Sequence, residues 1–308
     1  MVTNKVRISW RISLCLGLWF GCLLLLMSCR IPEPADWDEY PVPVDPGLGN
    51  EWKLLPLSDD FNYSAPPENK GNKFAERWID RYHNPWLGPG LTEWRTDHSW
   101  VADGNLVLDA SRNPNTDTVY TGIISSKETV IYPLYVEARA KISNMVLANS
   151  VWLLSPDDTQ EIDIVESYGS DRKGQEWFAR RVHLSHHVFI REPFQDYQPK
   201  DMGSWYNNGT TWRDDFHRFG VFWRDTWHLE YYVDGELVRT VSGKSIIDPN
   251  GFTSGTGLNK AMDVIIDVED QDWRSNDGLT PTDEELADEE RKQYHVDWIR
   301  FYQLVSNQ

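Results

Sequence analysis

Cysteine is scarce in this 308-residue chain, and its three cysteines all lie within the first 29 residues: Cys15, Cys22 and Cys29. If these N-terminal residues are a leader that is removed on export, the remaining domain can form no disulfide and carry out no thiol chemistry. Its core must therefore be held together by packing alone. No His/Cys cluster has zinc-like spacing either. The segment HLSHH contains His183, His186 and His187, but on a strand His183 would face opposite to His186, which argues against a three-histidine site.

Basic residues are also few, since 30 Lys and Arg stand against 48 Asp and Glu, for a net charge of −18. Removing the leader takes away three basic residues and no acidic ones, which makes the mature domain more acidic still. We expect no binding to nucleic acid or to an anionic bilayer through the general surface. A polyanionic substrate would be repelled unless basic residues gather at its site.

Long hydrophobic runs are missing except near the N-terminus, where LCLGLWFGCLLLLM follows three basic residues and precedes Ser28. This pattern predicts a signal peptide over residues 1–28; the alternative is an uncleaved membrane anchor, for which the run is rather short. Cys29 directly after Ser28 resembles the lipobox of bacterial lipoproteins and would become an acylated first residue. We therefore predict an exported protein, either anchored to the outer membrane through Cys29 or extracellular.

Residues 29–50 contain five prolines and little hydrophobic periodicity, which predicts a semi-stiff extended linker. From residue 51 to 308 we find no further break and no internal repeat. One domain is expected there, and we expect it to be a monomer.

Helix signals are nearly absent from this domain. Only TPTDEELADEERKQY, residues 280–294, predicts a helix, with Thr282 and Glu285 forming a capping box. Short runs with two-residue alternation dominate instead, and the Asp-Gly pairs at Asp103 and Asp234 predict tight hairpins. We predict an all-β fold: a two-sheet antiparallel β-sandwich with a concave cleft and one short helix near the C-terminus.

Tryptophan is abundant, with 16 residues in the chain. The segment YHNPWLGPGLTEWRTDHSW, residues 82–100, places Trp86, Trp94 and Trp100 among Gly and Pro, where a loop is expected. An indole held by a loop can present a flat face to the C–H face of a sugar ring; the alternative is that these rings belong to the core. We predict that at least one of the three binds a ligand.

The segment QEIDIVESYG, residues 160–169, holds three acids, Glu161, Asp163 and Glu166, in an otherwise strand-like run. In a regular strand Glu166 would point away from the other two. A β-bulge between Asp163 and Glu166 would absorb one residue and turn all three acids to one face. The alternative, a solvated outer face with scattered acids, fits poorly with the apolar flanks and the E-x-D-x-x-E spacing.

With such a bulge, the Cα atoms of Glu161 and Glu166 lie roughly 13 Å apart, and inward-leaning side chains leave about 5 Å between the carboxyl groups. This separation is typical of retaining glycosidases, near ~5–5.5 Å, and not of inverting ones, at ~6.5–9.5 Å. We assign Glu161 as nucleophile and Glu166 as acid/base. Asp163 would orient Glu161 and raise the proton affinity of Glu166 by like-charge repulsion.

EIDIVE resembles the bulged active-site signature of glycoside hydrolase family 16, and the similarity extends from about Trp52 to Tyr302. The longer segments YPLYVEARAKISN, HLSHHVFIREPFQDYQP and TPTDEELAD resemble bacterial β-agarases in particular. The resemblance implies a β-jelly roll that cuts the β-1,4 bonds of agarose with retention. No cofactor is expected in catalysis.

Carried over position by position, the resemblance marks the same three acids and also five substrate-binding residues: Trp94, Trp152, His187, Arg191 and Glu269. Purely structural roles are the alternatives, namely core for Trp152, a satisfied sheet histidine for His187, a surface ion pair for Arg191 and a loop acid for Glu269. Where β-agarases often have Asn-Thr before that Glu, this chain has Asp-Val.

A structural calcium ion on the convex side is a further implication of the resemblance. Asp60 and Asp297 are the candidate ligands, because hard oxygen donors suit Ca²⁺.

Two other functions stay open. The same enzyme could act on a sulfated galactan such as porphyran, which would need a cleft arginine, and Arg95 and Arg180 are available. A non-catalytic carbohydrate-binding surface lipoprotein is the alternative from another class, although it would not require three intact acids.

Overall fold

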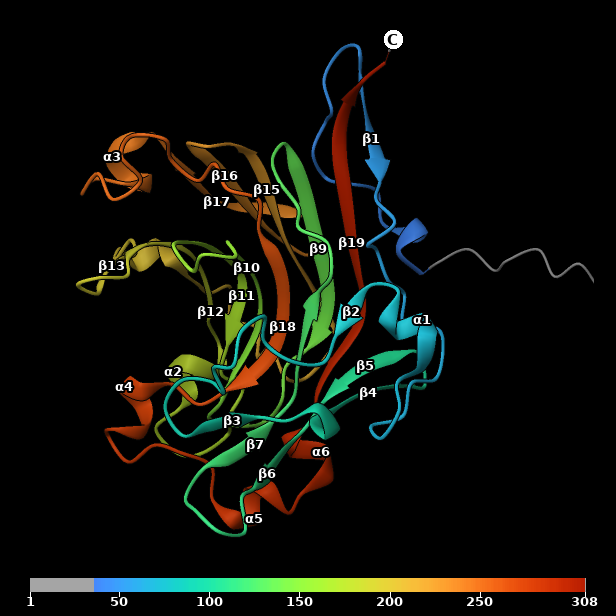
Figure 1. Ribbon diagram of the computed structural model, residues 1–308, viewed down its shortest axis with the longest axis vertical. Helices are drawn as coiled ribbons and strands as arrows, with labels where there is room; N and C mark the ends of the chain where they lie inside the picture. Colours follow the sequence, from blue (N-terminus) through green and yellow to red (C-terminus); the bar gives the residue numbers. More distant parts are fainter. Residues whose placement is uncertain (1–35, 308) are drawn as a thin grey trace, which may run out of the picture. The chain divides into compact units, whose positions relative to one another are not determined.

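The computed structural model describes residues 36–307 (Figure 1). The predicted signal peptide, residues 1–28, and the predicted lipid anchor at Cys29 lie outside the described residues and stay predictions. Within the described part, no helix is both long and apolar enough to cross a bilayer.

Two antiparallel sheets of eight strands each form the body of the domain, as predicted (Figure 1). Across the first sheet lie β17 (Glu236–Ser242), β16 (His228–Val233), β15 (His217–Asp225), β9 (Leu134–Lys141), β19 (Tyr294–Ser306), β5 (Asn105–Leu108) and β4 (Ser99–Ala102), with β1 (Asn50–Leu54) paired to β19. Across the second lie β13 (Gln195–Tyr197), β12 (Val182–Ile190), β11 (Gln160–Ser167), β10 (Ala148–Leu154), β18 (Asp263–Glu269), β8 (Ile123–Ser126) and β2 (Trp78–Ile79), with β14 (Trp205–Tyr206) paired to β12. A small third sheet contains β3 (Thr92–Trp94), β7 (Val119–Thr121) and β6 (Ala110–Arg112).

Both predicted Asp-Gly hairpins are present. Asp103-Gly104 joins β4 to β5 and Asp234-Gly235 joins β16 to β17. The φ angles are positive at both positions of each pair, 52° and 75° in the first and 51° and 84° in the second. This is the backbone conformation that matches a two-residue turn to the twist of the flanking strands.

Alternation along the second sheet separates a core face from an outer face. Val151 and Leu153 of β10 pack in the main core together with side chains of the first sheet such as Val136. Trp152 and Leu154 belong instead to a smaller cluster on the opposite face. Because successive side chains of a strand point to opposite faces, the outer face of this sheet is free to carry a ligand site.

The predicted helix over residues 280–294 is instead two short helices, α5 (Asp283–Leu286) and α6 (Glu289–Lys292). The expected capping box is present at α5. Asp288 then caps α6 by accepting hydrogen bonds from two backbone amides, so a new helix begins where one was expected to continue. The remaining helices are equally short: η1 (Asp36–Glu39), α1 (Gly71–Ala75), η2 (Thr96–His98), α2 (Glu176–Ala179), η3 (Met202–Ser204), α3 (Lys244–Ile247) and α4 (Asp272–Ser275).

The described part of the predicted linker, residues 36–49, packs on the domain and lies beside β1 and β19 (Figure 1). Trp37 is buried and meets the ring of Trp298 edge-on. Arg300 donates hydrogen bonds to the carbonyl oxygens of Trp37 and Tyr40. The domain therefore begins earlier than the predicted boundary at residue 51.

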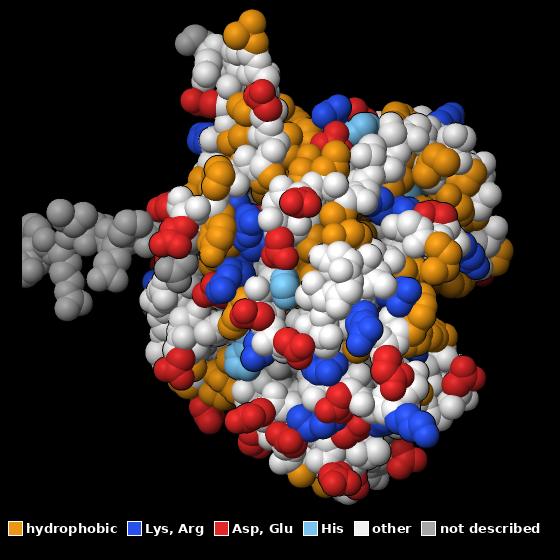
Figure 2. Space-filling model, turned by 180° about the vertical axis from the view of Figure 1, so that it is seen from behind, with side chains coloured by type: hydrophobic (Ala, Val, Ile, Leu, Met, Phe, Trp, Pro, Cys, Tyr) orange, Lys and Arg blue, Asp and Glu red, His pale blue; other side chains and the backbone are white. Residues whose placement is uncertain are grey.

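The side of the molecule turned away in Figure 1 shows acidic and basic side chains interspersed over much of its surface (Figure 2). The negative charge of the sequence is thus spread on this face and not gathered in one patch.

Candidate active site

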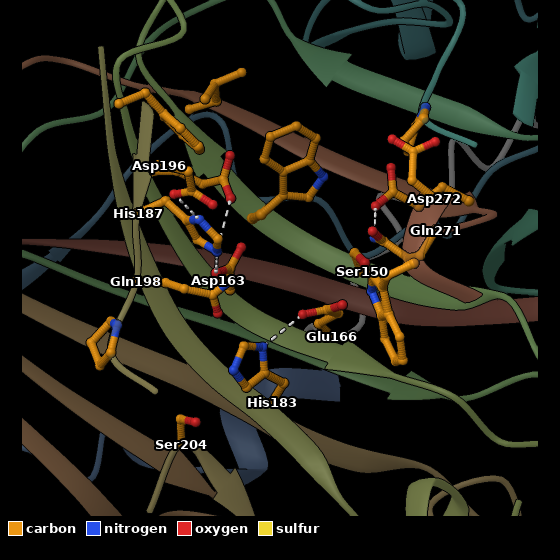
Figure 3. A pocket seen from close by; sticks show the side chains of 18 of the residues that line it. Ser150, Asp163, Glu166, His183, His187, Asp196, Gln198, Ser204, Gln271 and Asp272 are labelled. Atoms are coloured by element: carbon orange, nitrogen blue, oxygen red, sulfur yellow. Dashed lines mark hydrogen bonds and ion pairs between the residues drawn. The ribbon is translucent and has the colours of Figure 1, made fainter. Parts of the chain in front are cut away.

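A cleft of about 970 Å³ lies on the outer face of the second sheet. Side chains of β10, β11, β12 and β18 form its floor, and the segments 82–89, 191–205 and 271–273 form its sides. The polar side chains of the floor face one another across the cleft (Figure 3).

The three acids of β11 all line this cleft because the strand has the predicted bulge. Two residues of β11, Ile164 and Val165, lie between Asp163 and Glu166, whereas only one residue of β12 lies between their partners. The extra residue changes the parity of the strand, so Glu166 shares a face with Glu161 and Asp163. Ile164 and Val165 pack in the core behind them.

Glu161 and Asp163 form one half of the site together with His187. The Nε2 atom of His187 lies 3.8 Å from Glu161 Oε1 and 3.7 Å from Asp163 Oδ2, and its Nδ1 atom is 2.8 Å from Asp196 Oδ1 (Figure 3). Burial raises the pKa of Glu161 well above its ordinary value, and the nearby Asp163 raises it further. Burial opposes the charged form of His187, but Glu161, Asp196 and Asp163 together raise its pKa to about 10.

Glu166 forms the other half of the site. His183 Nδ1 lies 2.7 Å from its Oε2 atom (Figure 3). The hydroxyl of Tyr168 donates a hydrogen bond to Oε1. Burial acts to raise the pKa of Glu166, but these two partners outweigh it and hold the pKa below its ordinary value. The prediction that Asp163 raises the proton affinity of Glu166 is therefore wrong as a net effect in the free cleft, because it left out both partners.

Trp94 is not a platform in the cleft, contrary to the prediction. Its segment is the strand β3 and not a loop, and its ring is buried, with Nε1 donating to the carbonyl oxygen of Val268 at 3.2 Å. The Trp94 ring stacks on Tyr82, with centroids 5.3 Å apart, and Tyr82 lines the cleft. Trp86 lines the cleft directly with 47% of its surface exposed, whereas Trp100 lies in β4 of the first sheet.

Trp152 lies on the cleft floor, as predicted. Its ring stacks on Tyr82 at 6.3 Å, and its Nε1 atom donates to Asp267 Oδ1 at 3.1 Å. Asp267, where β-agarases often have Asn, thus orients Trp152 from the neighbouring strand β18, and burial raises the pKa of Asp267 to about 7. The departure from the family pattern has a local structural role.

Arg191 and Glu269 also line the cleft. The guanidinium of Arg191 stacks over the ring of Phe189 at 4.6 Å, and so the alternative of a surface ion pair is not supported. Glu269 accepts a hydrogen bond from Gln271, and burial together with Asp267 raises its pKa well above the ordinary value. Both side chains are placed to contact a ligand.

A group of aromatic side chains at the other end of the cleft was missed by the sequence analysis. Trp177, Trp205 and Trp273 line this end, and the ring of Trp205 stacks on His183 at 4.3 Å. Their positions in α2, β14 and α4 are far apart along the chain, so no local pattern connects them.

Two sets of side chains have the donor atoms that a metal ion would need. Among residues 36–307, the one group of three possible ligands comprises Glu161, Asp163 and His187, with atoms within 4.8 Å of one another. Since the pKa of His187 is about 10, we interpret this group as an ion-pair cluster. Asp60 accepts a hydrogen bond from the backbone amide of Asn62, and Asp297 forms an ion pair with Arg139. The calcium site stays a prediction.

The family model for beta-porphyranase A-D, GH16 domain, matches residues 52–304. The chain belongs to glycoside hydrolase family 16. Its relatives in this family include beta-agarase AgaA of Microbulbifer thermotolerans, 62% identical over 92% of this chain, which spans 66% of that protein's length. A beta-agarase of Phocaeicola plebeius is 58% identical, with 95% of this chain and 97% of that protein covered.

Solved structures of family 16 agree with the fold. Beta-agarase B from Zobellia galactanivorans superposes with a TM-score of 0.86 at 55% identity, covering 88% of this chain and 100% of that one. An inactivated mutant of beta-agarase B, solved in complex with agaro-octaose, gives the same TM-score at 54% identity and covers 88% of this chain and 100% of that one. These similarities confirm the predicted family and the two-sheet sandwich.

Proposed function

We propose that this chain is a retaining endo-glycoside hydrolase that cuts the β-1,4 bonds of agarose through a covalent glycosyl-enzyme intermediate. The bulge in β11, which brings Glu161, Asp163 and Glu166 into one cleft, is the observation that carries the proposal. Relatives 56–62% identical to the chain are named beta-agarases, which supports agarose as the substrate.

Glu161 acts as the nucleophile in this proposal. Its carboxylate attacks the anomeric carbon, and the positively charged His187, 3.8 Å away, stabilises its ionised form. Asp163, between the two glutamates along the strand, accepts the proton that Glu161 gives up when the sugar binds. Asp196 holds His187 in place by its contact with Nδ1.

Glu166 acts as the general acid and then as the general base. In the free cleft His183 and Tyr168 favour its carboxylate form, and burial is the opposing influence. A bound polysaccharide excludes water from the cleft and strengthens that opposing influence. We infer that Glu166 takes up its proton on substrate binding and delivers it to the leaving oxygen.

Agarose is favoured over sulfated galactans by the charges of the cleft. The two arginines considered for sulfate, Arg95 and Arg180, do not line it, and Arg191 is stacked on Phe189. A porphyranase of Zobellia galactanivorans is only 28% identical to this chain. The intact set of three carboxyl groups disfavours a pure binding function.

We place the enzyme outside the cell. A Streptomyces coelicolor relative, 35% identical over 99% of this chain, is named an extracellular agarase. Acylation at Cys29 and a monomeric state remain part of the proposal.

The test compares the parent with Glu161→Gln on agarose, porphyran, κ-carrageenan and laminarin. We expect the parent to release reducing ends from agarose, and Glu161→Gln to lose about 10³-fold or more of this activity while still binding agarose oligosaccharides. Glu236→Gln, on the exposed strand β17, is the control and should remain active. Binding without turnover by the parent would identify a binding module, and cleavage of porphyran alone would identify the rival enzyme.

A further inference from the structure

Arg274 of α4 is a buried cation that forms no salt bridge within the described part of the chain. It is 1% exposed and makes no ion pair with any carboxylate of the described residues. Its Nη2 atom donates to Gln175 Oε1 at 2.8 Å, while Nε and Nη1 are buried without a hydrogen-bond partner. Burying a cation in this way costs free energy, so a compensating interaction is expected.

Aromatic rings supply that interaction. The guanidinium carbon lies 4.3 Å from the ring centroid of Tyr168 and 4.5 Å from that of Phe178. The face of an aromatic ring attracts a cation, most strongly where water is excluded. Tyr168 is itself fully buried, so Arg274 and Phe178 fix the position of its ring.

The hydroxyl of Tyr168 connects this group to the catalytic acid. Tyr168 follows Glu166 by two residues, beyond the bulge, and donates its hydrogen bond to Glu166 Oε1. A change at Arg274 therefore reaches Glu166 through one ring and one hydrogen bond, although Arg274 itself does not line the cleft.

We propose that Arg274 is a positioning residue for Glu166: its buried charge holds Tyr168 as a hydrogen-bond donor to that carboxylate and stabilises its ionised form. The proposal rests on the proposed role of Glu166 as acid/base. Arg274, which does not line the cleft, would thus be one of the groups that set the pKa of the catalytic acid.

Other charged or titratable groups also act on Glu166. Those on β11, β12 and β18 are Asp163, His183, His187, Asp267 and Glu269, and Tyr168 directly follows β11. The acids favour a protonated Glu166, and the histidines favour an ionised one. Arg274 is the cation that acts on Glu166 from α4, and it also interacts, more weakly, with the charge of Asp270.

The test is the limb of the pH profile of kcat/KM that Glu166 controls. Since the pKa of the nucleophile Glu161 is raised and the pKa of Glu166 is lowered, this is the acidic limb, where Glu166 titrates in the free enzyme. Arg274→Met fills the same space without the charge, so the carboxylate of Glu166 loses stabilisation. We expect the limb to move to higher pH by about one unit. Arg274→Lys keeps the charge and should move the limb by less than half as much.

Arg218→Met is the matched control, because its guanidinium stacks over Tyr40 at 4.4 Å on the first sheet, far from Glu166 in the fold. It should leave the limb where it is. Gln175→Ala removes the one hydrogen-bond acceptor of Arg274 and, as a milder change, should give a smaller shift in the same direction, even where Arg274→Met fails to fold.

A second readout does not depend on turnover. The carboxyl ¹³C signal of Glu166, assigned by its absence in Glu166→Gln, should titrate at higher pH in Arg274→Met than in the parent. A titration unchanged by Arg274→Met and by Gln175→Ala overturns the proposal. A shifted titration in a protein that cleaves no agarose would instead uphold this link and refute the proposed function.

Discussion

Deleting Ile164 tests the connection between the bulge and the active site. At the bulge, β11 has two residues, Ile164 and Val165, opposite a single residue of β12. On the other side of β11, Val165 has a partner in β10 and Ile164 has none. Removing Ile164 restores a regular ladder in which Val165 points to the core, while Asp163 and Glu166 still point to the cleft.

The expected cost follows from what the deletion removes. Ile164 is fully buried, and losing one such side chain costs about 1.5–3 kcal/mol, less than the ~5–15 kcal/mol that stabilises a typical domain. The variant should therefore fold. Straightening the strand also moves Glu166 relative to Glu161, and a displacement of about 1 Å can reduce turnover roughly 10²-fold. We expect reduced but measurable cleavage of agarose.

Deleting both Ile164 and Val165 is the matched perturbation of opposite parity. It makes Glu166 the direct neighbour of Asp163 and so turns Glu166 toward the core, where an unpaired carboxylate is costly. We expect a strongly destabilised and inactive protein. Circular dichroism establishes folding, and reducing-end release gives kcat/KM. A folded variant that lacks only Ile164 and is as inactive as Glu161→Gln would refute the parity argument.

Three further predictions follow from contacts seen in the structure. Tyr168→Phe removes a charge-assisted hydrogen bond that favours ionised Glu166 and is worth about 1.5–3 kcal/mol. The acidic limb of kcat/KM, which Glu166 controls, should therefore move to higher pH by roughly 1–2 units. Tyr294→Phe, whose buried hydroxyl has no partner, should not move it; equal shifts in both would contradict this reasoning. Arg300→Met should lower the free energy of unfolding by about 3–5 kcal/mol in a denaturant titration, because it leaves the fully buried Glu137 without its closest cation. The half-exposed Arg224 is the control, and its change to Met should cost less than about 1 kcal/mol. At a calcium concentration of about 100 times the Kd, a bound ion would add ~2.7 kcal/mol to the free energy of unfolding, so chelation of calcium should lower the Tm. Asp297→Asn should abolish that response. A Tm that does not change on chelation would exclude the calcium site.

Much of the fold and the catalytic centre could be predicted from the sequence because their signals are local. Two-residue alternation and Asp-Gly turns reflect the geometry of a strand and its hairpin. The acids of β11 could be placed because the parity of a strand allows only one explanation for an inward-facing Glu166. Trp152, His187, Arg191 and Glu269 were found by resemblance, and all four line the cleft.

The remaining features depend on contacts between distant segments. His183 contacts Glu166 because the register of β12 makes the two residues strand partners on the C-terminal side of the bulge in β11. Tyr168 had a usable signal, since it follows Glu166 by two residues and shares its face. Trp94 was placed in a loop because its Gly and Pro neighbours mask a short strand that pairs with β7, 25 residues or more further along the chain.

The anomeric form of the first sugar released from agarose tests the central claim most directly. Proton NMR of fresh digests separates the initial product from its mutarotation. Because Glu161 and Glu166 face each other across one cleft for a double displacement, we predict that the β-anomer appears first and then equilibrates with the α-anomer. Initial release of the α-anomer would show inversion and contradict the assignment of Glu161 as nucleophile.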